Sequence, residues 1–182
     1  KRFATSQTQE MGAAFLGSGD TETFFNSAVY YKYLNLDLDA VGKHLNISDP
    51  ERLAQIAGAL LNAAILTHPT GKQNGLANPT FPELTLVEIS NTKRPVSYAN
   101  AFLQPVEGGA GKNLMTESAS AFNTYINDVA AAFAPSDVSR VLLSVGAASI
   151  TPELEHQKVK TLNELIEAVK QTCSPKRAVA AS

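Results

Sequence analysis

The chain has 182 residues, of which 44% are hydrophobic and 18% charged, and its formal net charge is -2. These values exclude a disordered chain and leave room for one ordinary domain. The single cysteine, Cys173, excludes an internal disulfide framework and a zinc cluster built from cysteines. No apolar run approaches the ~20 residues that span a bilayer, and no segment has the pattern of a signal peptide, so we expect a cytoplasmic protein without a membrane partner.

The first half of the chain predicts a strand followed by a helix. Aromatic and β-branched residues concentrate in residues 24–36, which is typical of a strand with both faces covered or with one face against a partner. Ser48 or Asp49 is then placed to cap a helix, with Pro50 in its first turn. Apolar residues follow at helical spacing until His68, which precedes a proline and ends the helix.

The second half alternates loops, strands and helices. A polar loop over residues 70–79 precedes a strand at 84–89, and a short helix is predicted from Pro95 to Phe102. A glycine-rich linker at 107–111 leads into a long helix over 116–133 and a strand over 138–145.

The chain ends with a helix and a polar tail. Thr161 and Glu164 form a capping box that opens the last helix. Residues 173–182 are expected to be a disordered tail, which leaves residues 1–172 as a single domain. Interleaved strands and helices predict an α/β or an α+β class with helices packed on a small sheet, and of the two we adopt α+β. Three strands are few for this length, so we expect an incomplete sheet that an absent segment or another chain completes.

No constellation of residues predicts catalysis. His44, His68 and His156 lack partners at metal-ligand spacing, and His156 is expected to be a solvated surface side chain in an irregular stretch. Cys173 near a helix end lacks the positive surroundings that activate a thiol. Residues 71–72 do not match a phosphate-binding loop. We therefore expect no enzyme activity, no metal and no cofactor.

The chain start carries one patch that suits a polyanion better than the net charge does. Arg2 offers a cation, Phe3 a ring that stacks on a base, and Thr5 and Ser6 hydroxyl donors for phosphate oxygens. The alternative for this patch is a frayed terminus.

A second candidate patch lies in the polar loop. Lys72 supplies a point charge between two glycines, and Gln73 and Asn74 supply amide donors and acceptors. The alternative is an ordinary connection between a helix and a strand. A further cationic pair, Lys93 and Arg94, is expected to be a solvated turn.

Taken in order, these segments resemble the CasC-type backbone subunit of Cascade, the type I-E CRISPR surveillance complex. The matching stretches are Arg2-Phe3-Ala4-Thr5-Ser6, Phe15-Leu16-Gly17, residues 26–35, Thr70-Gly71-Lys72-Gln73-Asn74, residues 97–102, residues 121–125 and residues 161–165. The resemblance implies a palm like an RNA-recognition motif, which is ferredoxin-like, with flanking helices and a projecting thumb. It also implies copies that polymerise along guide RNA (crRNA), other Cascade subunits as partners, target DNA bound through guide pairing, and no nuclease activity in this subunit.

The resemblance implies guide-RNA contact at Arg2, Phe3, Thr5 and Ser6, with Phe3 meeting a base. Lys72, Gln73 and Asn74 contact either RNA or a neighbouring subunit. The chain departs from the family because the N-terminal half and the thumb have no counterpart, so we expect a fragment, an engineered deletion or an ordered remainder. Two other functions stay open: a protein-only scaffold that pairs through its aromatic segment, and an uncharacterised α+β small-molecule binder.

Overall fold

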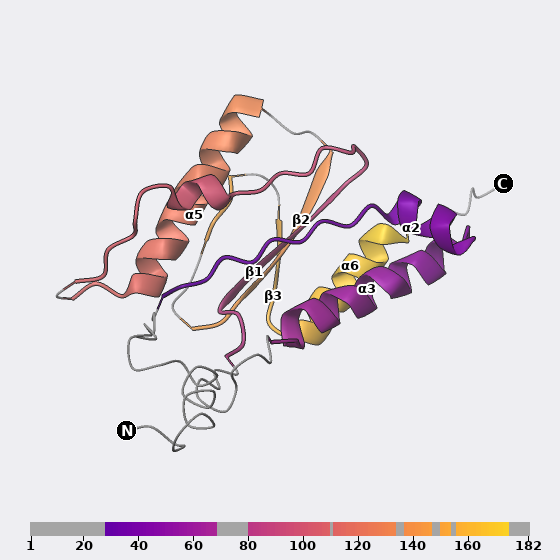
Figure 1. The fold of residues 1–182 in the computed structure, drawn as a ribbon, viewed down its shortest axis with the longest axis horizontal. Coiled ribbons are helices and arrows are strands. Elements are labelled where there is room, and N and C mark those ends of the chain that lie inside the picture. Colours follow the sequence, from indigo (N-terminus) through magenta and orange to yellow (C-terminus); the bar gives the residue numbers. More distant parts are fainter. Residues whose placement is uncertain are drawn as a thin grey trace, which may run out of the picture. The chain divides into compact units, whose positions relative to one another are not determined.

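The computed structural model describes residues 28–68, 80–109, 111–133, 137–146, 150–153 and 156–174. The chain divides into two compact units, Lys1–Tyr30 and Tyr31–Ser182, and the elements described below belong to the second unit. Its described residues form four α-helices, one 3-10 helix and a sheet of three strands (Figure 1). This is the predicted α+β class, and it is consistent with a ferredoxin-like palm with flanking helices.

The sheet has the order β1-β2-β3 and is mixed. β1 (Leu84–Ser90) pairs antiparallel with β2 (Val138–Ser144), with Leu84 opposite Ser144. β3 (His156–Val159) pairs parallel with β2. The structure confirms the strands predicted at 84–89 and 138–145. The prediction of an irregular stretch around His156 is wrong, because His156 lies half-buried in β3 and pairs with Arg140 in register.

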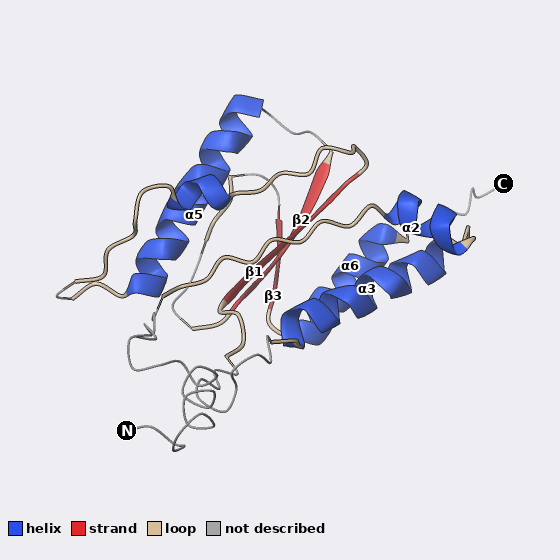
Figure 2. Cartoon of the chain, in the orientation of Figure 1, coloured by secondary structure: helices blue, strands red, loops and turns tan. Residues whose placement is uncertain are grey.

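Alternate side chains of the sheet enter two separate cores. Leu142 packs with buried residues of α5 (Leu114–Phe133), whereas Val141 and Leu143 pack with buried residues of α6 (Leu162–Cys173). Successive residues of a strand point to opposite faces, so one strand serves both cores. Figure 2 shows α5 on one side of the strands and α6 with α3 (Pro50–Leu66) on the other.

The helix starts follow the sequence signals. Asp49, one of the two predicted caps, accepts a hydrogen bond from the Glu51 N–H at 3.1 Å and so starts α3. Thr161 accepts from the Glu164 N–H at 3.2 Å and starts α6. The Glu164 carboxylate accepts from the Lys160 N–H at 2.8 Å, one residue before the position that a capping box uses.

Three other helices complete the described part of the unit. α5 begins at Leu114, two residues before its predicted start, because Asn113 accepts from the Met115 N–H at 2.9 Å. The predicted helix at 95–102 is reduced to the 3-10 helix η1 (Ala99–Phe102). α2 (Leu38–Leu45) was not predicted, and it is capped by Asp37.

The prediction of a strand over residues 24–36 is wrong for its described part, since residues 28–36 pair with no strand and residues 24–27 lie outside the described residues. Side chains hold this segment instead. The Tyr31 ring lies 5.8 Å from that of Phe102 and 6.0 Å from that of Phe122, and its hydroxyl accepts from the Tyr98 N–H at 3.1 Å. Tyr31, one of the aromatic residues that predicted a strand, therefore anchors the segment to η1 and α5.

Candidate nucleic-acid interface

All seven predicted RNA-binding residues lie outside the described residues. Arg2, Phe3, Thr5 and Ser6 precede residue 28, and Lys72, Gln73 and Asn74 fall within residues 69–79. The predicted tail beyond Ser174 also lies outside them, whereas Cys173 belongs to α6. The structure does describe the two ends between which the polar loop runs.

The two ends of the polar loop carry aromatic rings in contact. His68 lies two residues beyond the last residue of α3, and Phe81 lies three residues before the first residue of β1. Their ring centroids are 6.2 Å apart and the ring planes meet at 51°. Phe81 is 66% exposed and belongs to neither core. In the sequence His68 marks a helix end without metal-ligand spacing, and no local pattern pairs it with Phe81.

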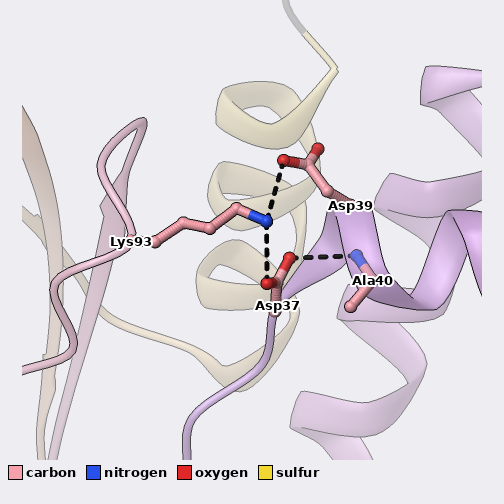
Figure 3. A network of polar contacts seen from close by, with 4 residues as sticks. All are labelled: Asp37, Asp39, Ala40 and Lys93. Atoms are coloured by element: carbon pink, nitrogen blue, oxygen red, sulfur yellow. Dashed lines mark hydrogen bonds and ion pairs between the residues drawn. The ribbon is translucent and has the colours of Figure 1, made fainter.

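Lys93 is exposed, yet two carboxylates neutralise it. Its ammonium lies 2.9 Å from Asp37 Oδ2 and 3.5 Å from Asp39 Oδ2 (Figure 3). The hydrogen bond from the Ala40 N–H, followed by the bond from Lys93, lowers the pKa of Asp37, and the bond to Asp37 raises the pKa of Lys93. The predicted turn is exposed, as expected, and Lys93 also links the end of β1 to the start of α2 through these carboxylates.

Arg140 is buried and bound within the protein. Its Nε donates to Glu88 Oε1 at 2.7 Å, and the Tyr98 hydroxyl donates to the same oxygen at 2.9 Å. Only 2% of the Arg140 side chain is exposed, so this cation serves the fold. Burial, followed by the charge of Glu88, raises the pKa of Tyr98 to about 12, which keeps the phenol as a donor.

The described residues also bear on a metal site, on the Cys173 thiol and on membrane-spanning helices. Among the described ranges no group of three or more His, Cys, Asp or Glu side chains is placed to hold a metal ion. Burial raises the pKa of Cys173, so the thiol is disfavoured as a nucleophile. Of the helices in the described ranges, none is long and apolar enough to cross a membrane.

Exposed cations without an internal ion pair remain as candidates for phosphate contact. In the part of the chain that the structure describes, these include Arg94, Lys112, Lys158 and Lys160. The described cations therefore divide into those with an internal carboxylate partner, such as Lys93 and Arg140, and exposed ones outside the ion pairs given above. The formal net charge of -2 counts both kinds of cation alike.

Comparison with known families identifies the chain. The sequence profile of the CT1975-like proteins, a family of Cas proteins, matches residues 4–168. The chain belongs to the CT1975-like family. The matched range covers the described elements as far as residue 168, within α6. It also contains every predicted RNA-binding residue except Arg2 and Phe3. No protein of curated function matches the chain in a sequence comparison.

Solved structures share the fold of this CT1975-like protein. A chain of a "CRISPR RNA-guided surveillance complex" aligns with a TM-score of 0.64 and 24% identity, covering 75% of this chain and 50% of the matched chain. A chain of a "CRISPR RNA-guided surveillance complex, pre-nicking" aligns with the same TM-score and identity, covering 75% of this chain and 35% of the other. The protein thus spans between about a third and half of these structural relatives.

Proposed function

We propose that this chain is a structural backbone subunit of a Cascade-type CRISPR surveillance complex, and that it binds guide RNA without catalysing a reaction. The observation that carries the proposal is the family match over residues 4–168. The fold shared with chains of CRISPR RNA-guided surveillance complexes supports it. The motifs that resemble the CasC-type subunit place the chain, within this proposal, in the type I-E class.

In this role, copies of the subunit polymerise along crRNA in the cytoplasm and bind other Cascade subunits. Target DNA is recognised through pairing with the guide, so the protein holds backbone and shape and does not read bases. The whole assembly then serves antiviral defence.

The proposed RNA contacts fall into two groups. Arg2, Thr5 and Ser6 bind phosphate oxygens while Phe3 meets a base. Lys72, Gln73 and Asn74 bind the backbone from the polar loop, whose glycines allow close approach.

Salt dependence of RNA affinity tests the proposal. Each phosphate contact to a single strand contributes about 0.7 to the slope of log affinity against log salt concentration. We expect Lys72→Ala to weaken binding and to flatten the slope by about 0.7. Lys93→Ala removes the same charge from a lysine that Asp37 and Asp39 already engage, and it serves as the control. Equal slopes for wild type and Lys72→Ala contradict the site, and absence of RNA binding by wild type contradicts the function.

A protein-only scaffold is the second candidate, and one observation favours it. Tyr33, Leu34 and Leu36 are exposed by 42%, 61% and 36% in a segment that pairs with no strand, which suits a protein partner. Assembly that proceeds equally well without RNA favours this candidate over the first.

A small-molecule binder has weaker support. A cavity of about 340 Å³ lies between α3 and α6, and its lining includes the polar residues Gln55, Asn62, Asn163, Glu167 and Lys170. Small-molecule sites are lined predominantly by apolar side chains with few polar groups, so this lining does not fit one well.

A further inference from the structure

We propose that Phe81, supported by His68, is a stacking platform for an unpaired nucleobase of bound RNA. The inference rests on the proposed RNA-binding function and adds a site that consists of these two described residues. It begins from the exposure of Phe81, which is 66% although the chain has two well-formed cores. Burial of a large aromatic ring is favourable, so a ligand that covers the exposed Phe81 ring gains binding free energy.

The geometry leaves a face of the Phe81 ring accessible. Ring planes that meet at 51° with centroids 6.2 Å apart are tilted against each other, whereas stacked rings lie parallel. The contact with His68 therefore orients the phenyl ring without covering it as a stacked partner does. A flat base fits the remaining face.

The position of the pair suits a single-stranded nucleic acid. His68 and Phe81 bracket the polar loop in the sequence, and Pro82 follows Phe81 with a fixed backbone φ angle. The imidazole of His68 adds a ring nitrogen that donates a hydrogen bond to a phosphate or a base. Glu83 is the first acidic residue after Phe81 in the sequence. Its Oε2 atom lies 3.7 Å from the position that a Cβ atom on Gly146 would take. Its carboxylate therefore lies at the turn that contains Gly146.

Stacking has an energetic signature that phosphate binding lacks. Loss of one base-aromatic stack lowers affinity by roughly 5- to 150-fold, and it releases no counterions. Phe81→Ala should therefore weaken binding of a single-stranded oligoadenylate by this factor while leaving the slope of log affinity against log salt unchanged. Phe81→Leu keeps an apolar side chain but no aromatic face, so it should lose nearly as much affinity.

The absence of tryptophan from the chain makes a direct optical test available. Phe81→Trp creates a single indole reporter, whose emission should be quenched when oligoadenylate binds and unchanged when an abasic oligomer of the same backbone binds. Leu103→Ala removes another exposed apolar side chain, 78% exposed, and should leave affinity unchanged.

The outcomes separate the two proposals. If wild type binds oligoadenylate, and Phe81→Ala binds it equally well with no quenching in Phe81→Trp, the stacking site is wrong and the proposed function stands. If Phe81→Ala keeps RNA affinity but weakens assembly of the protein alone, Phe81 contacts protein and the inference is overturned. If wild type binds no RNA, the proposed function fails and the stacking site fails with it.

Discussion

Replacement of Glu88 by leucine measures how far the fold depends on the ion pair between β1 and β2. Glu88 Oε1 accepts from Arg140 Nε at 2.7 Å and from the Tyr98 hydroxyl at 2.9 Å. The side chains of Arg140 and Glu88 are 2% and 20% exposed. Glu88→Leu therefore leaves a guanidinium buried without its counter-charge and a phenol without its acceptor.

The expected cost follows from this burial. Removing one partner of a buried pair costs about 3–5 kcal/mol, because the other charge stays desolvated. The free energy of unfolding of a typical domain is about 5–15 kcal/mol, so the variant should lose a large share of it. The double variant Glu88→Leu/Arg140→Met removes both charges and should recover most of the loss.

Urea unfolding followed by circular dichroism measures these free energies. Lys93→Ala is the matched control, because its ion pairs lie at the surface and such pairs are worth about 0–1 kcal/mol. A loss below about 1 kcal/mol for Glu88→Leu would refute the reasoning. A double variant as unstable as the single variant would also refute it, since the buried unpaired charge would then not be the cause.

Three further changes test local features of the fold. Thr161→Ala removes the cap of α6 and should lower the free energy of unfolding by about 1 kcal/mol, measured by urea unfolding. Gly42→Ala should destabilise the protein although alanine favours helices, because the added Cβ would lie 2.8 Å from the backbone oxygen of Ile47; the melting temperature reports this. Tyr98 has a pKa raised to about 12, so its favourable contribution should be complete below pH ~10 and be lost as pH rises to about 12, measured as the stability difference from Tyr98→Phe against pH.

Each of these changes has its own control. Thr161→Ser keeps the capping oxygen and should retain most of the stability, so an equal loss in both variants would argue against capping. Lys43→Ala lies beside Gly42 on an exposed position and should change the melting temperature little. A stability difference for Tyr98→Phe that stays constant from neutral pH to pH ~12 would contradict the raised pKa.

Sequence patterns within a single segment predicted those helices and strands whose start or burial depends on residues of that same segment. The cap at Asp49 and Pro50 in the first turn gave the start of α3, and Thr161 gave the start of α6. β1 and β2 were found because each is a short segment rich in leucine, valine or isoleucine, whose alternate residues serve two cores.

Elements that depend on distant partners were not predicted correctly. β3 has four residues, and its pairing with β2 defines it more than its sequence does. The aromatic residues near Tyr31 have high strand propensity, yet the ring contacts of Tyr31 are to η1 and α5.

The candidate site shows the same division between local and distant information. The sequence indicated Lys72 and Arg2 by residue type, but both lie outside the described residues. The contact between His68 and Phe81 joins residues on either side of a loop, so residue types gave no sign of it. Likewise, Lys93 was identified as a surface cation, whereas its two carboxylate partners come from the start of α2.

Native mass spectrometry of the protein with single-stranded RNAs of increasing length tests the central claim most directly. A backbone subunit that polymerises on guide RNA should bind in copies whose number rises with RNA length, and it should form no such series without RNA. A single bound copy at every RNA length, or the same oligomers with and without RNA, would contradict the proposed role.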